Sequence, residues 1–325
     1  MNIFNSKKLF ITGGLGFIGS NLINYLLNNG FEGGITIFDN NSIDNTPAVN
    51  KLRSYKNVKI IFGDLQLPEL VNDAIKGSDM VIHLAANSDI SKGVFNPSID
   101  FKNTVLATQN LLSAMLLAGV SKIIFSSGSG VYGDVSDIFI PEDFGPLIPV
   151  SHYGASKLCA ESMISSYVHM HNFHAVIFRF ANVIGNGQTH GVAYDFIRKV
   201  LKNRETLEVL GDGSQLKSYI HVNDIIQGIL IACQNTKRNI DYFNVSTDDA
   251  ISVKEIALMV IEKMSLDSSI IFGKTPFGWK GDVPKIFLKN DKIKSLGWLP
   301  SMNTKQAMGI AITEMLYDIK YKLGN

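Results

Sequence analysis

The sequence predicts an α/β protein with a doubly wound parallel sheet and a smaller mixed domain toward the C-terminus. Two observations predict this fold class. Apolar strand-like runs alternate with helix-like segments through the first 180 residues, and a glycine-rich turn directly follows the first run. Beyond residue 180 the pattern becomes irregular and richer in glycine and asparagine. A chain of 325 residues is also long for a single core, so two domains are expected.

Each expected element rests on its apolar pattern. Short apolar runs predict buried strands at 8–12, 34–38, 58–62, 80–86, 122–127 and 175–180. Apolar residues at helical spacing predict helices at 20–29, 68–76, 103–118 and 153–171, with shorter ones at 192–202, 222–234 and 253–264. Gly30 ends the first helix. Right-handed crossovers join parallel strands, and ligands bind at the carboxyl ends of such strands.

The glycine-rich turn carries a dinucleotide-binding pattern. It runs Gly13-Gly14-Leu15-Gly16-Phe17-Ile18-Gly19 and fits both G-x-G-x-x-G from Gly14 and G-x-x-G-x-x-G from Gly13. Glycines allow the tight turn, the close approach to pyrophosphate and the packing of helix on strand. Asp39 ends the second strand about twenty residues further on, where a carboxylate binds the adenosine ribose and repels a 2′-phosphate. The pattern therefore favours NAD over NADP; an ordinary turn with a solvated aspartate is the alternative.

A second pattern, Tyr153-Gly154-Ala155-Ser156-Lys157, places a phenol and an ammonium on one helix face. An ammonium beside a phenol favours the phenolate, so we expect Lys157 to lower the pKa of Tyr153. Such a pair can move a proton off an alcohol or sugar hydroxyl while a nicotinamide takes the hydride. The spacing also occurs by chance in many helices, so its weight comes from the surrounding motifs.

Composition excludes several classes of function. The hydrophobic fraction is 46% and the net charge is +1, which describes a globular protein and gives no support for nucleic-acid or anionic-membrane binding. No apolar run approaches membrane-spanning length, and the N-terminus lacks a signal-peptide pattern, so we expect a cytoplasmic protein. Cys159 and Cys233 are expected to be buried thiols without a disulfide. No metal site is expected.

Further motifs follow in order along nearly the whole chain. They read G-D-L from Gly63, H-L-A-A from His83, S-S-x-x-x-V-Y-G from Ser126, R-F-A-N from Arg179 and L-G-W-L-P from Leu296. Together with the two patterns above, they resemble the extended short-chain dehydrogenase/reductase family, which includes the NAD-dependent sugar-nucleotide epimerases and dehydratases. The resemblance implies a Rossmann domain that binds NAD, comprising residues 1–180 with about 218–246 returning to it. It also implies a substrate-binding domain comprising 181–217 and 247–325.

The resemblance also implies roles for individual residues. The expected cofactor-binding residues are Gly13, Gly16, Phe17, Ile18 and Gly19 at the pyrophosphate, Asp39 and Asn40 at the adenosine ribose, Asp64 and Leu65 at the adenine, Leu84, Ala85 and Ala86 beneath the dinucleotide, and Ser126. Tyr153 would be the acid/base, and Lys157 would bind the nicotinamide ribose. The expected substrate-binding residues are Ser88, Ser129, Asn182 and Lys217. Asn182 could instead be a structural turn residue.

The chain departs from the family pattern beside the catalytic tyrosine. Gly128 stands where the family places a serine or threonine hydroxyl, so Ser127, or else Ser129, would supply it. We expect Ser127 to be the catalytic hydroxyl; otherwise Tyr153 would act alone. Ser129 and Gly130 also stand where the 4,6-dehydratases carry Asp-Glu, so no carboxylate is available there for elimination chemistry.

Other departures concern the substrate and a helix register. Lys217 occupies a position where arginine is common in the family, and Lys280 stands in a second such position. A lysine neutralises phosphate as a point charge but lacks the bidentate fork. Asn103 and Thr104 compete for the asparagine role at the start of helix 103–118.

The motifs together favour one reaction. The expected function is NAD-dependent epimerisation of a nucleotide-diphosphate sugar at C4, through a transient 4-keto intermediate. The alternatives are a sugar-nucleotide dehydrogenase, reductase or dehydratase of the same family, and a non-catalytic NAD-binding regulator. A homodimer formed by helices 103–118 and 153–171 is expected, because their apolar faces are wider than one sheet contact needs.

Overall fold

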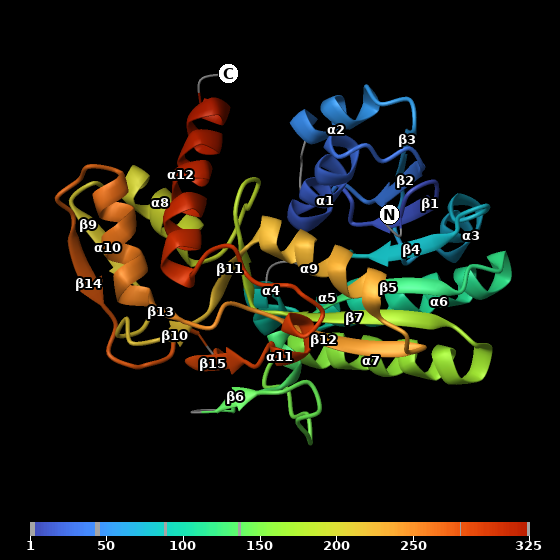
Figure 1. Ribbon diagram of the computed structural model, residues 1–325. Helices are drawn as coiled ribbons and strands as arrows, with labels where there is room; N and C mark the ends of the chain where they lie inside the picture. Colours follow the sequence, from blue (N-terminus) through green and yellow to red (C-terminus); the bar gives the residue numbers. More distant parts are fainter. Residues whose placement is uncertain (1–3, 43–45, 88–89, 136–137, 280, 324–325) are drawn as a thin grey trace. The chain divides into compact units, whose positions relative to one another are not determined.

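The computed structural model describes residues 4–42, 46–87, 90–135, 138–279 and 281–323 (Figure 1). The chain divides into two compact units. The first comprises 1–131, 152–179 and 229–243, and the second comprises 132–151, 180–228 and 244–325. The contacts therefore group 132–151 with the second unit, and the segment that returns to the first unit is shorter than the expected 218–246. Which unit binds which ligand stays a prediction.

The first unit is built on a seven-stranded sheet with the order β12-β7-β5-β4-β1-β2-β3. The strands are β1 (Lys8–Thr12), β2 (Gly34–Asp39), β3 (Val58–Phe62), β4 (Met80–His83), β5 (Lys122–Gly128), β7 (His174–Phe180) and β12 (Ile240–Val245). The pairs from β3 through β2, β1 and β4 to β5 are all parallel. The strand order reverses between β1 and β4, which is where a doubly wound sheet binds its ligand. The predicted fold class is confirmed.

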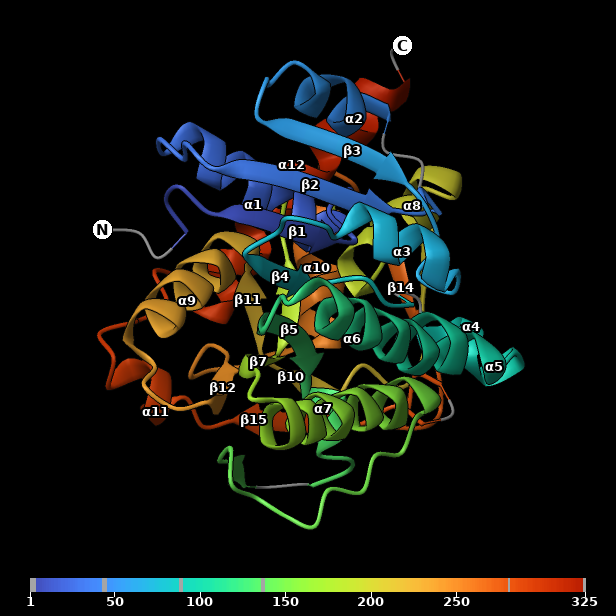
Figure 2. The same cartoon turned by 90° about the vertical axis from the view of Figure 1, so that its right-hand side faces the viewer.

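Helices cover both faces of this sheet. α3 (Pro68–Ala74), α6 (Ala107–Ala118) and α7 (His152–His171) lie along one face, and α1 (Phe17–Asn28) lies on the other (Figure 2). Fully buried side chains of α6 and α7, among them Leu111, Met115 and Ile164, pack with Phe125 of β5 in one core. Each such side chain contributes about 1.5–3 kcal/mol on burial. The apolar side chains whose spacing predicted these helices are therefore the ones that pack against the sheet.

Two helical regions of the first unit differ from the predicted ones. The predicted helix 103–118 is preceded by α4 (Ile90–Phe95) and α5 (Ser98–Asp100), and it begins as a π-helical turn, η1 (Phe101–Leu106), before α6. α2 (Thr46–Arg53) was not predicted from the sequence, because only half of its eight residues are apolar and the segment is too short to show a clear helical period.

A buried ion pair ties α7 to β7. Arg179 donates from Nη2 and Nε to the two carboxylate oxygens of Glu161, at 2.7 and 3.0 Å. Both side chains are almost fully buried, and the guanidinium lies 5.0 Å from the ring centroid of Tyr242. The bidentate geometry satisfies two oxygens with two parallel N–H groups, which a buried pair requires.

The second unit combines helices with small sheets. Its four-stranded sheet has the order β13-β10-β15-β6 and contains both parallel and antiparallel pairs. Two further pairs are β11-β8 and β14-β9. Its strands are β6 (Phe139–Ile140), β8 (Asn182–Ile184), β9 (Thr206–Val209), β10 (Leu216–Lys217), β11 (Tyr219–His221), β13 (Ile251–Ser252), β14 (Ser269–Phe272) and β15 (Lys285–Leu288). The smaller mixed sheets therefore agree with the predicted C-terminal fold class.

The helices of the second unit form its core. α8 (Val192–Lys202), α10 (Val253–Lys263) and α12 (Thr304–Leu323) pack their apolar faces together. α9 (Val222–Asn235) begins in this unit and ends in the first, and α11 (Asp291–Lys294) is a single short turn. The sequence predicted α8, α9 and α10 to within one residue at either end but not α12.

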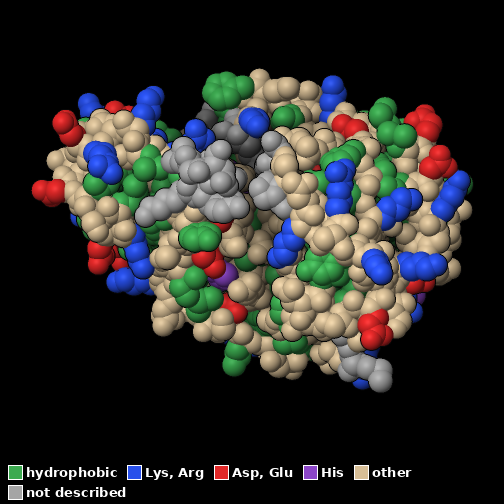
Figure 3. Space-filling view, turned by 90° about the horizontal axis from the view of Figure 1, so that it is seen from above, with side chains coloured by type: hydrophobic (Ala, Val, Ile, Leu, Met, Phe, Trp, Pro, Cys, Tyr) green, Lys and Arg blue, Asp and Glu red, His purple; other side chains and the backbone are tan. Residues whose placement is uncertain are grey.

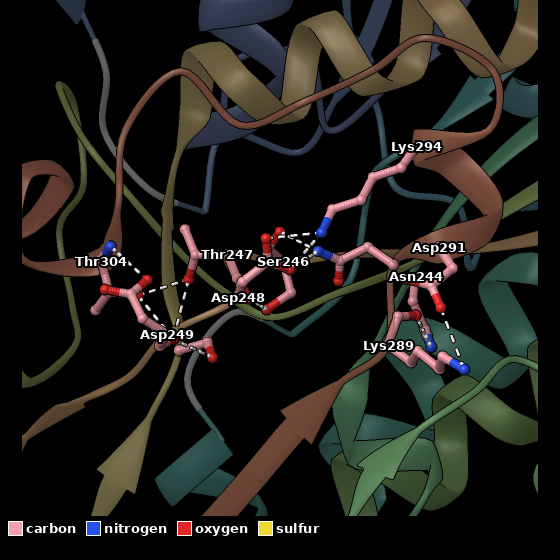
Figure 4. A network of polar contacts seen from close by, with 11 residues as sticks. Asn244, Ser246, Thr247, Asp248, Asp249, Lys289, Asp291, Lys294 and Thr304 are labelled. Carbon is pink, nitrogen blue, oxygen red and sulfur yellow. Dashed lines mark hydrogen bonds and ion pairs between the residues drawn. The ribbon is translucent and has the colours of Figure 1, made fainter.

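A polar network joins loops of the second unit that are distant in sequence (Figure 4). Asn244 donates from Nδ2 to the carbonyls of Ile140 and Lys289, and Lys294 pairs with Asp248 at 2.6 Å. The backbone N–H of Thr304 donates to Asp249 at 2.9 Å, which fixes the start of α12. These bonds satisfy polar groups in loops that lack regular partners.

The surface contains charges of both signs. Lysine, arginine and acidic side chains all occur on the face shown in Figure 3. Among the described residues, no helix is long and apolar enough to cross a membrane. Both cysteines are free thiols, but only Cys233 is buried. The prediction that Cys159 is buried is wrong, because it lies on an exposed position of α7.

The buried pair gives a prediction for stability. Glu161→Ala leaves the Arg179 guanidinium buried without its carboxylate and should lower the free energy of unfolding by about 3–5 kcal/mol. Urea unfolding followed by circular dichroism measures the change. Asp73→Ala, which removes the exposed pair of Asp73 with Lys76, is the matched control and should leave stability nearly unchanged. Equal losses in the two variants would contradict a structural role for the buried pair.

Candidate active site

The glycine-rich turn after β1 lies against the backbone that follows β4. Gly13 has φ +67°, and a Cβ atom there would lie 2.7 Å from the backbone nitrogen of Ala85. A Cβ at Gly19 would lie 2.5 Å from the carbonyl oxygen of Gly13. Both contacts are with backbone, which cannot move aside as a flexible side chain can. The turn and residues 84–86 therefore adjoin at the point where the strand order reverses.

The start of α1 fits a pyrophosphate group. Gly16 is its N-cap and supplies no side-chain capping bond, and the first turn carries no acidic residue. The backbone N–H groups at a helix N-terminus and the positive end of the helix dipole favour an anion. Glycine at 13, 16 and 19 allows the close backbone contacts that form the turn before this helix. The residues expected to hold the NAD pyrophosphate therefore fit that group.

Asp39 organises the neighbouring loop. Its Oδ2 accepts from the N–H of Leu15 at 3.0 Å, and its Oδ1 accepts from the N–H of Asn41 at 2.8 Å. Burial raises the pKa of Asp39, and the two backbone bonds partly oppose this rise. Each carboxylate oxygen can accept a further bond, so ribose binding by Asp39 is compatible with this geometry. The neighbouring Asn40 is exposed.

The expected adenine residues lie after β3. Asp64 accepts from the N–H of Gln66 at 2.8 Å, and the Gln66 amide in turn donates to Asn103 at 3.1 Å. Leu65 is buried, and its carbonyl accepts from Asn110 of α6 at 2.8 Å. Asn103 and Thr104 are the two candidates for the asparagine role at the start of this helix. Asn103 contacts the Asp64 loop through Gln66. The Thr104 side chain is buried, and its hydroxyl has no partner among the described residues.

Lys157 is buried at the carboxyl end of β5. Its ammonium donates to the carbonyl of Ser126 at 2.7 Å and lies 4.8 Å from the ring centroid of Phe125. It also lies 5.8 Å from the ring centroid of Tyr153, one helical turn away on α7. The structure thus brings together three of the expected site residues, Ser126, Tyr153 and Lys157.

Burial dominates the protonation of this pair. It lowers the pKa of Lys157 to about 7, although the charges of Glu161 and Asp100 act in the opposite direction. It raises the pKa of Tyr153 to about 12, and the negative charge of Asp100 adds to that rise. The sequence predicted the opposite shift for Tyr153. That prediction is wrong for the protein alone, because loss of hydration outweighs the attraction of one ammonium.

The serine positions near Tyr153 differ in their surroundings. Ser127 is buried within β5, and its hydroxyl has no hydrogen-bond partner among the described residues. The hydroxyl of Ser126 donates weakly to the carbonyl of His83 at 3.4 Å. Ser129 is only partly buried, in the short 3₁₀ turn η2 (Ser129–Val131). An unpaired buried hydroxyl is available to another group, which is consistent with the expected role of Ser127.

Gly130 packs against the start of α7. A Cβ atom there would lie 3.8 Å from a ring carbon of Tyr153 and 3.5 Å from the Cα of Gly154. The position where a family dehydratase carries a glutamate is therefore adjacent to the tyrosine, and here it holds no side chain. The site has no carboxylate at positions 129 and 130 to move protons at neighbouring sugar carbons.

The sequence did not predict a buried series of side-chain hydrogen bonds that joins β1, β4 and α6. The ring of His83 bonds Thr12 at 2.7 Å through Nδ1 and Thr108 at 3.0 Å through Nε2. Burial, with a contribution from the Lys157 charge, lowers the pKa of His83 to about 3, so the ring is neutral. His83 belongs to the H-L-A-A motif, but its two threonine partners lie on β1 and α6 and are known only from the structure.

The expected substrate residues of the second unit have their own partners. Asn182 of β8 donates from Nδ2 to the carbonyl of Ser218 at 3.1 Å, and its Oδ1 remains available. Lys217 forms an ion pair with the buried Asp282 at 2.6 Å. The sequence predicted a role for Lys217 but not its pairing with Asp282, which partly neutralises the Lys217 charge. Ser88 and Lys280 lie outside the described residues. Among the described residues, no group of acidic, cysteine or histidine side chains could hold a metal ion.

Comparisons with known proteins agree with this geometry. Residues 9–246 match the model of the NAD dependent epimerase/dehydratase family. A putative UDP-glucose 4-epimerase of Methanocaldococcus jannaschii is 33% identical over 92% of this chain and 95% of its own. A crystal structure of a UDP-galactose 4-epimerase is 32% identical, with a TM-score of 0.85 over 96% of this chain and 99% of that one. The UDP-glucose 4-epimerase of Thermus thermophilus, solved with NAD, is 27% identical, with a TM-score of 0.83 over 95% and 99%.

The close contact between Gly13 and the backbone of Ala85 gives a prediction. Gly13→Ala should weaken NAD binding at least tenfold and destabilise the protein, because the new methyl group meets the backbone of Ala85. Gly30→Ala is the matched control. Gly30 has φ +76° and open space around it, so alanine there should cost only about 1 kcal/mol of left-handed strain. Calorimetric titration with NAD and urea unfolding measure both effects. Unchanged NAD affinity in Gly13→Ala would contradict the placement of the pyrophosphate.

Proposed function

Because the chain belongs to the NAD dependent epimerase/dehydratase family, we propose that it epimerises a nucleotide-diphosphate sugar at C4 through a transient 4-keto sugar. One observation carries this choice of reaction. Tyr153 and Lys157 adjoin at the carboxyl end of β5, and the neighbouring positions 129 and 130 carry no carboxylate. Such a site can oxidise and reduce one carbon but lacks the groups needed for elimination.

Each residue has a defined task in this proposal. NAD, when bound, supplies reversible hydride acceptance from the sugar carbon. Tyr153 accepts the proton of the 4-hydroxyl and returns it when the carbonyl is reduced from the other face. Lys157 stabilises the phenolate and binds the nicotinamide ribose, while Ser127 donates a hydrogen bond to the reacting oxygen. The 4-keto sugar must turn about its diphosphate between the two steps, which requires that the diphosphate stay bound.

The names of the relatives favour UDP-glucose and UDP-galactose as substrates. In the second unit, Lys217 and Asn182 are the side chains we assign to the sugar nucleotide. The ion pair with Asp282 orients the Lys217 ammonium, which then acts on the diphosphate as a point charge. A net dehydrogenase or reductase is the second candidate, because the same tyrosine and lysine would serve it.

The proposal includes a homodimer in the cytoplasm. Leu117 at the end of α6 and Met170 at the end of α7 are 77% and 75% exposed, and Leu116 is also exposed. Apolar side chains on these two helices support an interface between copies of the chain. Both cysteines are free thiols, as is usual in a reducing compartment.

Replacing the proposed acid/base tests the reaction. Tyr153→Phe should lower kcat for the interconversion of UDP-glucose and UDP-galactose by about 10²–10⁴, the usual factor for a general acid or base. Product ratios measured by chromatography give the rate. The native enzyme should release no net NADH, which absorbance in the nicotinamide band measures. Stoichiometric NADH release would instead identify a dehydrogenase.

A pair of variants tests which serine supplies the hydroxyl that Gly128 lacks. Ser127→Ala should lower kcat roughly tenfold to a hundredfold, the effect of losing one hydrogen bond to a developing charge. Ser129→Ala is the matched comparison and should retain most activity. If Ser129→Ala is the impaired variant, the hydroxyl comes from the 3₁₀ turn instead of from β5.

The proposed dimer predicts a defined mass in solution. Light scattering at micromolar concentration should give twice the mass of the 35.7 kDa chain. Leu117→Glu should dissociate the dimer, because it places a charge in an apolar interface. A monomeric native protein would refute the dimer and leave the proposed reaction unaffected.

A further inference from the structure

We propose that Asp100 is a positioning residue for the proposed reaction: its buried carboxylate holds the loop after β4 and sets the electrostatic field at Tyr153 and Lys157. The inference concerns the proton transfer assigned to Tyr153, so its kinetic part rests on the proposed function. No motif of the sequence singled out Asp100. It lies at the end of the three-residue helix α5, immediately before the π-helical turn η1.

The carboxylate of Asp100 is buried and only partly bonded. Its residue is 1% exposed. Oδ1 accepts from the Nδ2 of Asn87 at 2.9 Å, and Asn87 directly follows the residues expected beneath the dinucleotide. Oδ2 has no hydrogen-bond partner among the described residues. A buried carboxylate oxygen without a protein partner requires an explanation, and a role beyond anchoring the loop is the one we pursue.

Glycine at position 93 makes room for this carboxylate. A Cβ atom on Gly93 of α4 would collide with Oδ2 of Asp100 and would lie 3.8 Å from the Cβ of His152. The unpaired oxygen therefore lies where α4 meets the first turn of α7, the turn that carries Tyr153. Any larger residue at 93 would displace it.

The other charged groups near the pair are neutralised or tied elsewhere. His83 on β4 is neutral. Glu161 on α7 is held by both nitrogens of Arg179 from β7. Burial raises the pKa of Asp100, and the bond from Asn87 and the charges of His152 and Lys157 oppose that rise. Among the described residues that face the pair, Asp100 is thus the carboxylate with no guanidinium or ammonium bonded to it.

This charge has opposite consequences for the two catalytic groups. It raises the pKa of Lys157 against the lowering by burial, so it helps to keep the ammonium charged near neutral pH. It also raises the pKa of Tyr153, so it disfavours the phenolate. Asp100 therefore favours a charged lysine beside a protonated tyrosine, the state in which the site can return a proton to a 4-keto sugar.

The test replaces the charge and keeps the shape. Asp100→Asn retains an oxygen that can accept from Asn87. Ultraviolet absorbance of phenolate against pH, with a Tyr153→Phe background subtracted, isolates the titration of Tyr153. The Tyr153 pKa should fall by roughly one pH unit in Asp100→Asn, since a nearby negative charge is lost. The acidic limb of the kcat profile should move to lower pH by a similar amount. Asp73→Asn, an exposed carboxyl on α3, is the matched control and should shift neither.

A second variant keeps the test decisive if Asp100→Asn does not fold. Asp100→Ser also removes the charge and keeps a hydroxyl that can accept from Asn87, so the Tyr153 pKa should again fall by roughly one pH unit. A folded Asp100→Asn, or a folded Asp100→Ser, with an unshifted Tyr153 titration overturns the proposal. The titration needs no turnover. A shifted titration in a protein that converts no sugar nucleotide would therefore refute the proposed reaction and leave the role of Asp100 standing.

Discussion

The burial of one ammonium group, that of Lys157, constrains much of the first unit. A charge removed from water needs nearby dipoles and counter-charges, and here these come from separate parts of the chain. The Ser126 carbonyl is supplied by the end of β5, the Phe125 ring by the same strand, and the carboxylates of Glu161 and Asp100 by α7 and α5. β5, α7 and the α5 turn must therefore keep their relative positions if the lysine is to stay charged beside Tyr153.

A second constraint is the close approach of backbone to backbone at the point where the strand order reverses. Gly13 touches the backbone of Ala85, and Gly19 touches that of Gly13. These contacts place the start of α1 beside the loop after β4. The same loop ends at Asn87, which Asp100 holds from the other side. The turn proposed to hold the pyrophosphate and the pair proposed to transfer the proton are thus linked through residues 84–87, so a displacement of this loop would affect both.

The parts of the fold that were predictable are those with a strong local pattern. The strands β1 and β3 and the helix α8 have the bounds that apolar runs and helical spacing gave. α2 was not predicted because it is short and only half apolar, and α12 was not predicted because it follows the last of the family-like motifs. The accessibility of Cys159 was misjudged, since an apolar helix sequence does not say which of its residues face the sheet. In the proposed site, the glycines and Asp39 were named from their spacing after the first strand, and Tyr153 and Lys157 from their spacing together with the surrounding motifs.

The sequence by itself determined the family and the fold class and indicated the acid/base pair proposed above, because these depend on residue types at short, fixed spacings. Only the tertiary structure decided the protonation of the pair, the environment of Ser127, and the partners His83–Thr108, Lys217–Asp282 and Asp100–Asn87. Hydration and charge act through space, so they depend on residues that are far apart in the chain. The pKa of Tyr153 demonstrates this: one helical turn predicted a fall, and burial with a distant carboxylate produced a rise.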